Sequence, residues 1–473
     1  MKNIPDHIQS VYFIGIAGIG MSALARYFLH RGVSVSGFDR DRSELAIQLE
    51  TEGANIHYEQ DISQLSTAPD LVVYTPAIPA DHTELLYFRR LGVTVVKRSE
   101  LLGYFSRQMK CIAVAGTHGK TTTSTMIAFV LRACGLDCTA FLGGIAADFE
   151  GNFVAGKSEW MVVEADEYDR SFLQLAPDVA VVTSLDPDHL DIYGSFEEMR
   201  ATFLEFMHKV KPGGVLILHE DVVSKFDSEM TEKFFGALLD NQIVMLTYGE
   251  RDNFFKVIEI EPEGDGMRFD FYYATYRQLL KDVRLPMVGK HNVLNASAAL
   301  ATVAILERNK RWHCDIRLDE AAEKLRDFKG IKRRFEIVYR SENLIIIDDY
   351  AHHPAELSAA ISAAKAHFPQ KKLTGVFQPH LYTRTKDFFK EFAAALSALD
   401  VCILVELYPA REQPIEDVSS ALIFDLVESK VKYLTTKIEL TDLLGAVDPE
   451  ILLFLGAGDL DRIIPEIINE IVT

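Results

Sequence analysis

The residues best equipped for chemistry follow an apolar stretch, Cys111–Val114. They form the turn Gly116-Thr117-His118-Gly119-Lys120-Thr121, after which apolar residues recur at helical spacing as far as Gly135. A turn of small residues at a helix N-terminus directs backbone N–H groups at one point, where Lys120 adds a positive charge and Thr121 offers a hydroxyl for Mg²⁺. The pattern predicts a binding site for a triphosphate.

This turn differs from a strict P-loop, because Val114 stands five residues before Gly119, where that motif has a glycine. The alternative interpretation is an ordinary glycine-rich connection with an incidental lysine. The strand before the turn and the helix after it favour phosphate binding.

Two polar clusters follow later strands of the same region. The stretch Trp160–Val163 leads into Glu164-Ala165-Asp166-Glu167-Tyr168-Asp169, and Val179–Thr183 leads into Ser184-Leu185-Asp186-Pro187-Asp188-His189. Sheets of the α/β class hold their ligands at the carboxyl ends of strands. Carboxylates and an imidazole at that edge suit Mg²⁺ held partly through phosphate oxygens, although a single acidic residue there is more often surface charge.

A second glycine-rich turn, Gly15-Ile16-Ala17-Gly18-Ile19-Gly20, joins the strand Val11–Ile14 to another helical pattern. The next strand ends at Asp39, where a carboxylate can reach a ribose hydroxyl. Ala17 interrupts the G-x-G-x-x-G motif, so the signal for nucleotide binding is weak. Tight packing of a strand on a helix is the alternative.

Strands alternate with helices along most of the chain, which predicts an α/β protein. The length of 473 residues suggests about three domains. We expect a Rossmann-like domain, a P-loop-type domain with a mixed sheet, and a second Rossmann-like domain at residues 1–107, 108–330 and 331–473. Period-two patterning at residues 253–288 predicts a small antiparallel excursion in the middle domain. Asn292 and Asn295 then share one helix face, with helix capping by Asn292 as the alternative.

The composition excludes several classes of protein. A net charge of −20 argues against sequence-independent binding of nucleic acid. No apolar run approaches the roughly 20 residues that span a bilayer, so we expect no membrane insertion. The five cysteines form no C-x-x-C pair, and the first ten residues lack a signal-peptide pattern. We therefore expect a cytoplasmic protein, either a monomer or a homodimer.

Taken together and in order, these motifs resemble those of the Mur ligase family, and the resemblance covers essentially the whole chain. The strings that carry it are GIAGIGMSALAR, AGTHGKTTT, EADEYDRSF, DPDHLDIYG, GKHNVLNA, KRRFE, DDYAHHPAE, FQPHLYTRT and GAGD. The resemblance implies an ATP-dependent ligase that joins L-alanine to the carboxylate of UDP-N-acetylmuramate through an acyl phosphate, in peptidoglycan precursor synthesis. It implies ATP and Mg²⁺, with the UDP-sugar and L-alanine as the other substrates.

The resemblance also assigns roles to residues. Catalysis would involve Lys120, Glu164, His189 and Arg334. ATP would meet Gly116, Thr117, His118, Gly119, Lys120, Thr121, Thr122, Asn292, Asn295, Arg334 and Asp349. The UDP-sugar would meet Gly15, Ala17, Gly18, Ile19, Gly20, Asp39, Thr75, Pro76 and Ala77. The amino acid would meet Tyr350, His352, His380 and Arg384. Magnesium would be held by Thr121, Glu164 and His189, and we expect the last two to lie close together on neighbouring strands.

Three departures from the family pattern stand out. Leu381 replaces an arginine after His380, and Tyr168 makes the EADEYD segment bulkier than the usual EADESD. Sister ligases carry a carbamylated lysine after the DHLD segment, whereas residues 200–204 contain none. The first departure leaves one cation fewer on the substrate side, and the third means that the metal site must form without that lysine.

Three alternatives remain open on the sequence. A nicotinamide-dependent oxidoreductase would explain the first glycine turn and Asp39, but not Lys120 or the acidic clusters. A non-catalytic nucleotide-binding module would bind ATP without forming an amide. Within the family, a recycling ligase would attach a murein tripeptide to UDP-N-acetylmuramate, an alternative favoured by EADEYD but not by FQPHLYTRT.

Overall fold

The computed structural model describes residues 4–5, 7–65, 68–188, 190–226, 234, 236, 238–410 and 412–472. The chain forms two compact units. Unit 1 comprises Met1–Ile258, Asp270–Val283 and Leu294–Lys329, and unit 2 comprises Glu259–Phe269, Arg284–Val293 and Gly330–Thr473. None of the helices in the described part of the chain is both long and apolar enough to cross a membrane.

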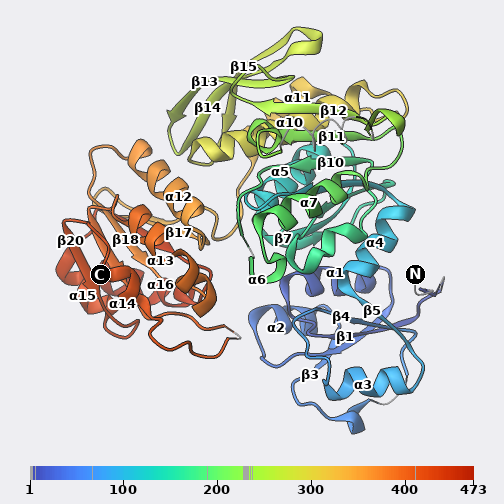
Figure 1. The fold of residues 1–473 in the computed structure, drawn as a ribbon, viewed down its shortest axis with the longest axis horizontal. Helices are drawn as coiled ribbons and strands as arrows, with labels where there is room; N and C mark the ends of the chain where they lie inside the picture. Colours follow the sequence, from blue (N-terminus) through green and yellow to red (C-terminus); the bar gives the residue numbers. More distant parts are fainter. Residues whose placement is uncertain are drawn as a thin grey trace. The chain divides into compact units, whose positions relative to one another are not determined.

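The first sheet has the strand order β3-β2-β1-β4-β5, and every pairing in it is parallel. Its strands are β1 (Ser10–Ile14), β2 (Ser34–Phe38), β3 (Asn55–His57), β4 (Leu71–Tyr74) and β5 (Thr94–Lys97), and its helices are α1 (Ile19–His30), α2 (Glu44–Thr51), α3 (Thr83–Arg90) and α4 (Arg98–Gln108). Apolar side chains from both faces are buried, as expected for a parallel sheet between helices (Figure 1).

The second sheet has ten strands in the order β15-β14-β13-β12-β11-β10-β6-β9-β7-β8. The strands are β6 (Lys110–Ala115), β7 (Thr139–Ala146), β8 (Gly151–Val154), β9 (Trp160–Glu164), β10 (Val179–Val182), β11 (Val215–His219), β12 (Val244–Gly249), β13 (Phe255–Glu263), β14 (Gly266–Tyr273) and β15 (Gln278–Leu285). Its helices include α5 (Lys120–Ala133), α6 (Leu190–Tyr193), α7 (Phe196–Met207), α8 (Glu220–Val223), α10 (Lys290–Arg308) and α11 (Leu318–Lys324).

This second sheet is mixed, as predicted. β6 pairs in parallel with both β9 and β10, whereas β7 and β8 pair antiparallel. The period-two stretch forms β13 to β15, and the two-residue connection between β13 and β14 can join only antiparallel strands. One expectation was wrong: β9 and β10 are not neighbours, because β6 lies between them. The clusters that follow β9 and β10 therefore flank the turn after β6.

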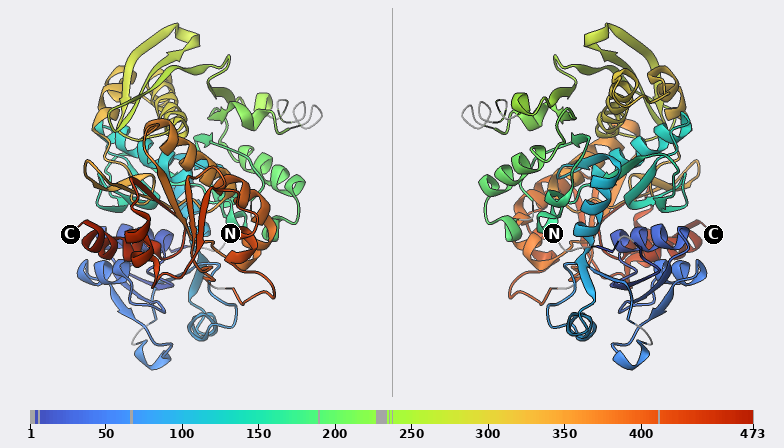
Figure 2. Two further views of the ribbon diagram at one scale, coloured as in Figure 1. Left: turned by 90° about the vertical axis from the view of Figure 1, so that its left-hand side faces the viewer. Right: turned by 90° about the vertical axis from the view of Figure 1, so that its right-hand side faces the viewer.

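The third sheet has the order β16-β17-β21-β18-β19-β20, parallel except for the β16–β17 pair. Its elements are β16 (Glu336–Arg340), β17 (Ile345–Asp349), α12 (Pro354–His367), β18 (Leu373–Phe377), α13 (Tyr382–Leu396), β19 (Val401–Leu404), α14 (Ser420–Phe424), β20 (Val431–Leu434), α15 (Leu440–Val447), β21 (Ile451–Leu455) and α16 (Ile464–Val472). Figure 2 shows these orange-to-red strands between two layers of helices, α12 to α14 on one face and α15 and α16 on the other.

Each predicted domain thus contributes one sheet, and the α/β class with a mixed middle sheet is confirmed. The residue boundaries at 107 and 330 stay predictions. Within unit 1 the first two sheets share one apolar core: Tyr27 and Phe28 of α1 pack with Phe105 of α4, and Tyr27 also packs with Phe141 of β7. Helix α1 therefore has its apolar face buried against both sheets.

Candidate functional site

The turn between β6 and α5 has a backbone that depends on its two glycines. Gly116 has φ +140°, and a Cβ there would lie 2.1 Å from the Thr183 hydroxyl oxygen. Gly119 has φ +77°, and its Cβ would lie 2.6 Å from Oδ1 of Asn295. Both positions exclude a side chain by conformation and by space. The backbone of the turn is therefore packed directly against polar side chains.

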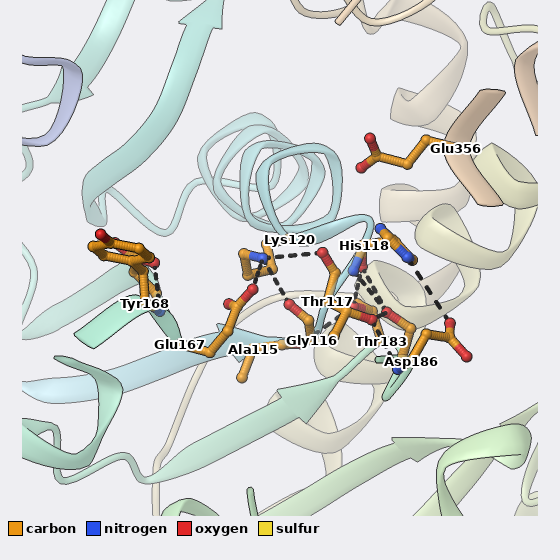
Figure 3. Close-up of polar contacts among 12 residues, drawn as sticks. Ala115, Gly116, Thr117, His118, Lys120, Glu167, Tyr168, Thr183, Asp186 and Glu356 are labelled. Carbon is orange, nitrogen blue, oxygen red and sulfur yellow. Dashed lines mark hydrogen bonds and ion pairs between the residues drawn. The ribbon is translucent and has the colours of Figure 1, made fainter. Parts of the chain in front are cut away.

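The segment that follows β10 supports this turn (Figure 3). The Thr117 and Ser184 hydroxyl oxygens lie 2.9 Å apart, and the His118 N–H donates to the Ser184 hydroxyl over 2.7 Å. The Asp186 N–H donates to the Thr117 hydroxyl over 3.1 Å. The sequence predicts that the carboxylates and the imidazole of residues 184–189 suit Mg²⁺, and in the structure Ser184 and Asp186 also shape the loop.

Lys120 points into the turn that precedes it. Its ammonium donates to the Gly116 carbonyl over 2.7 Å, to the Thr117 carbonyl over 3.2 Å and to Oε1 of Glu167 over 2.9 Å. The Lys120 side chain is 15% exposed and that of Glu167 only 1%. All three donor positions of the ammonium are used, so an incoming phosphate oxygen would replace one of these acceptors.

Glu167 is the partner that sequence reasoning did not assign. Burial raises the pKa of its carboxyl to about 7, and the Lys120 ammonium opposes that shift. Glu167 lies within the acidic cluster that the sequence indicated, but the sequence carries no signal for which of its carboxylates pairs with Lys120. That choice depends on the irregular backbone of the segment after β9, in which Asp169 and Arg170 have positive φ values.

Glu164 is the residue of this cluster best suited to a metal ion. Its Oε2 atom is buried and has no hydrogen-bond partner in the described structure. The carboxylate lies directly over Gly143, where a Cβ would approach within 2.2 Å. A desolvated carboxylate oxygen without a donor is costly unless a cation meets it, so Glu164 fits a Mg²⁺ ligand.

The other two predicted ligands fit less clearly. His189 lies outside the described residues, and among the residues that the structure describes no three His, Cys, Asp or Glu side chains come together as a metal site. Thr121 is buried in the first turn of α5, and its carbonyl accepts from the Ser124 and Thr125 hydroxyls. Such an arrangement suits Mg²⁺ held mainly by phosphate and water oxygens, with one or two protein ligands.

The two asparagines of α10 have different surroundings. Asn295 accepts a hydrogen bond from the Thr123 hydroxyl over 3.1 Å. This bond joins α10 to α5, the helix that follows the Lys120 turn, within unit 1. The side-chain amide of Asn292 donates to the Val288 carbonyl over 2.8 Å, within unit 2. Asn295 therefore lies at the predicted loop, whereas the described contact of Asn292 is a local one at the start of its helix.

The glycine-rich turn after β1 is closed by its neighbours. The N–H groups of Gly15 and Ile16 both donate to the Phe38 carbonyl, and the Ala17 N–H donates to Oδ2 of Asp39 over 2.8 Å. Asp39 thus holds the turn itself through Oδ2, while its Oδ1 accepts from the Asp41 N–H over 3.4 Å. The predicted residues Thr75, Pro76 and Ala77 follow β4, and the Thr75 methyl group lies against Gly15.

In unit 2, two adjacent arginines contact the same ring. Each guanidinium carbon, of Arg333 and of Arg334, lies 5.1 Å from the ring centre of Tyr350. Arg333 also donates to the Gly456 carbonyl over 2.6 Å and lies 3.3 Å from Asp348, so it joins β17 to the segment after β21. Asp349 accepts from the N–H groups of Phe335 and Ala351, and burial raises its pKa to about 6.

The residues predicted to meet the amino acid form a row of rings at the carboxyl edge of the third sheet. The ring centres of Tyr350 and His352 are 5.3 Å apart, and those of His352 and His380 are 6.2 Å apart. Tyr408, which the sequence did not indicate, stacks on His380 at 5.8 Å. Arg384 is 8% exposed in the first turn of α13. The structure therefore gathers three of the four residues in one cluster.

Family models match nearly all of the chain. The model described as "Mur ligase family, catalytic domain" matches residues 10–110, "Mur ligase middle domain" matches 114–303, and "Mur ligase, glutamate ligase domain" matches 333–458.

Known relatives extend over the same length. The UDP-N-acetylmuramate–L-alanine ligase of Cytophaga hutchinsonii is 42% identical over 471 residues, covering 98% of this chain and 96% of the relative. That of Parabacteroides distasonis is 43% identical over 474 residues, covering 99% and 98%. Among solved structures, UDP-N-acetylmuramate-alanine ligase from Thermotoga maritima has a TM-score of 0.79 and 28% identity over 98% of this chain and 99% of that chain. Because both the models and these relatives span nearly the entire sequence, the chain belongs to the Mur ligase family.

Proposed function

We propose that this protein is an ATP-dependent ligase that joins L-alanine to the carboxylate of UDP-N-acetylmuramate through an acyl phosphate. The observation that carries the proposal is the Lys120 turn beside an orphaned Glu164 carboxylate, in a chain 42% identical over almost its whole length to a ligase of that name. We assign UDP to the glycine turn of the first sheet, ATP to the Lys120 turn, and L-alanine to the row of rings in unit 2.

The chemistry explains why these residue types are present. A carboxylate is a poor electrophile, so it must first accept the γ-phosphoryl group before an amine can attack it. Both reactants of that first step are anions, and cations must lie between them. Lys120 supplies one positive charge at the start of α5, where the helix N-terminus adds its own partial positive charge.

Magnesium, when bound, would supply positive charge that offsets the negative charge of the transferred phosphoryl group and of the departing ADP. Glu164 would hold the ion, with the Thr121 hydroxyl and His189 as the other proposed protein ligands. Ser184 fixes the shape of the turn, because its hydroxyl contacts the Thr117 hydroxyl and accepts from the His118 N–H.

Arg384 is the proposed partner of the L-alanine carboxylate, since arginine can bind a carboxylate through two parallel hydrogen bonds. Arg334 and Asp349 are proposed to serve the nucleotide. Asn292 and Asn295 are proposed to serve it as well, and Asn295 already contacts α5.

The test is an assay of the full chain with ATP, Mg²⁺, UDP-N-acetylmuramate and L-alanine. We expect phosphate release to require both other substrates and to match the amount of UDP-N-acetylmuramoyl-L-alanine found by mass spectrometry. A parallel reaction replaces L-alanine with the murein tripeptide. Product with the tripeptide and none with L-alanine would overturn the proposal in favour of the recycling reaction.

A further inference from the structure

Arg98 is a cation that none of the motifs and none of the proposed roles uses. It is the first residue of α4 and follows β5 directly. Its Nη2 donates to Oδ2 of Asp166 over 2.7 Å, and its side chain is 18% exposed. Arg98 therefore joins the last connection of the first sheet to the acidic segment after β9.

The same guanidinium lies against the glycine-rich turn. A Cβ on Gly20, the second residue of α1, would lie 2.2 Å from Nη1 and 3.0 Å from Cζ of Arg98. No side chain fits there without moving the guanidinium. One planar group thus contacts the proposed UDP-sugar helix with one nitrogen and the acidic segment with the other.

Asp166 is held on both of its oxygens. The Tyr168 N–H donates to Oδ1 over 3.0 Å, while Arg98 occupies Oδ2. Asp166 lies between Glu164 and Glu167, the two carboxylates nearest to the proposed metal ion and to Lys120. A change in the Arg98–Asp166 contact would therefore shift both of them.

Arg98 also forms part of the wall of a recess beside these carboxylates. The recess is small, with a volume of about 10 Å³. Its lining combines a cation, two carboxylates, two hydroxyls and three apolar side chains, namely Arg98, Glu164, Asp166, Ser99, Ser171, Leu102, Phe172 and Leu175. Arg98 therefore borders a space that reaches the orphaned Glu164 carboxylate.

A second contact holds the same two regions of unit 1 together. Asn152 of β8 is fully buried; its Oδ1 accepts from Arg26 over 2.5 Å, and its side-chain amide donates to the Ser22 hydroxyl over 2.9 Å. Because Ser22 and Arg26 belong to α1, this contact fixes α1 against the second sheet. Arg98 thus acts between two elements whose spacing is already set.

We propose that Arg98 is a positioning residue: by holding Asp166 against the first turn of α1, it sets where the carboxylate of the UDP-sugar meets the γ-phosphate of ATP. The inference rests on the proposed function, because that function supplies the two anions. A displacement of about 1 Å between reacting groups can cost on the order of 10²-fold in rate. Arg98 is therefore expected to govern turnover more than binding.

Three variants test this role. Arg98→Gln removes the charge, and Arg98→Lys keeps a cation of different geometry. Gly20→Ala keeps the arginine at position 98 but introduces a methyl group at the place that its Nη1 occupies. The substitution is at a helical position, where alanine is favoured over glycine. The control is Lys97→Gln, which removes the adjacent cation and its ion pair with Asp169 on the same acidic segment.

We expect Arg98→Gln and Gly20→Ala to lower kcat on the order of 10²-fold, with the KM values for the UDP-sugar and ATP changed by about threefold or less. The kcat of Arg98→Lys should lie between those of these two variants and that of the unmodified chain. Lys97→Gln should change kcat by about threefold or less, since its ion pair is exposed. The double variant Asp166→Asn/Arg98→Gln should have a kcat no lower than that of either single variant.

Hydrogen exchange gives a readout that does not need activity. Amides of residues 166–172 should exchange faster in Arg98→Gln and Gly20→Ala, but not in Lys97→Gln. A rise in the UDP-sugar KM at unchanged kcat would overturn the proposal, because Arg98 would then bind that substrate directly. Unchanged exchange in Arg98→Gln would overturn it too. If the unmodified chain forms no product while the exchange still changes, the proposed function fails and the Arg98–Asp166 contact stands.

Discussion

The two glycine-rich turns of unit 1 share a local design and differ in their charge. Each joins a buried parallel strand to the start of a helix, β1 to α1 and β6 to α5. The turn after β6 contains its own cation, Lys120, held by the buried Glu167 carboxylate. The turn after β1 contains none, and a carboxylate, Asp39, closes it.

The difference shows that both sites use the N-terminus of a helix, and that each site adds different charged side chains to it. A triphosphate whose terminal group is transferred needs a cation at the point of transfer, and Lys120 occupies the first position of α5. A diphosphate that is only bound can use backbone N–H groups. A guanidinium from α4 lies beside the first turn, where Arg98 reaches Gly20.

The largest expected effect comes from Lys120→Met. Turnover should be lost, because Lys120 is the cation at the first position of α5 that would meet the transferred phosphate. Unfolding should become easier by about 3 kcal/mol above pH 7, since a buried carboxylate is left without its partner. Assays and denaturant melts of this variant and of Lys120→Met/Glu167→Gln check both points. The double variant should recover stability and not activity; recovery of activity would refute the role of Lys120.

Glu164→Gln should have the next largest effect. Losing a metal ligand should lower turnover on the order of 10- to 100-fold and raise the Mg²⁺ concentration needed for half-maximal rate. Stability should be unchanged or slightly higher, because the buried Oε2 has no hydrogen-bond partner to lose among the residues that the structure describes. A magnesium titration checks this, with Glu159→Gln as control, an exposed carboxylate that precedes the same strand. Equal magnesium curves for both variants would refute the assignment.

Asp39→Ala should affect only the first turn. The Ala17 N–H loses its acceptor, and the KM for the UDP-sugar should rise on the order of tenfold, the value of one hydrogen bond to a charged group. The KM for ATP should stay the same, because the Lys120 turn is braced separately. Steady-state kinetics would measure both KM values. The control is Asp41→Ala, which changes an exposed neighbouring carboxylate. A change confined to ATP would mean that the two turns had been assigned the wrong way round.

The smallest effect concerns pH. Because burial raises its pKa to about 7, the Glu167 carboxyl keeps its proton in the folded chain up to about pH 7, whereas the unfolded chain loses it near the ordinary pKa of 4.5. The folded state then binds more protons between these values, so this group's contribution to stability is full below pH 4.5 and is lost as the pH rises through about 7. The loss should be on the order of 1–3 kcal/mol. Chemical denaturation across that range should show a flatter slope for Glu167→Gln, and parallel curves would contradict the assignment.

Residue types and periodicity alone determined the local elements of this protein. The predicted strands Trp160–Val163 and Val179–Thr183 correspond to β9 and β10, each with one end displaced by one residue, and α5 follows the Lys120 turn. These features are encoded within a few residues of one another, because glycine conformations, proline geometry and apolar periodicity act locally. The resemblance to the Mur ligase family also depended only on the sequence, through its motifs and their order.

Only the tertiary structure decided which of these elements meet. β6 lies between β9 and β10, so the two acidic clusters lie on either side of the Lys120 turn and not next to each other. Glu167 and not another carboxylate pairs with Lys120, and Arg98 reaches both Gly20 and Asp166. Such pairings join residues far apart in the chain and depend on strand order and on backbone turns with positive φ. No local pattern in the sequence encodes them, because packing of the whole sheet sets their distances.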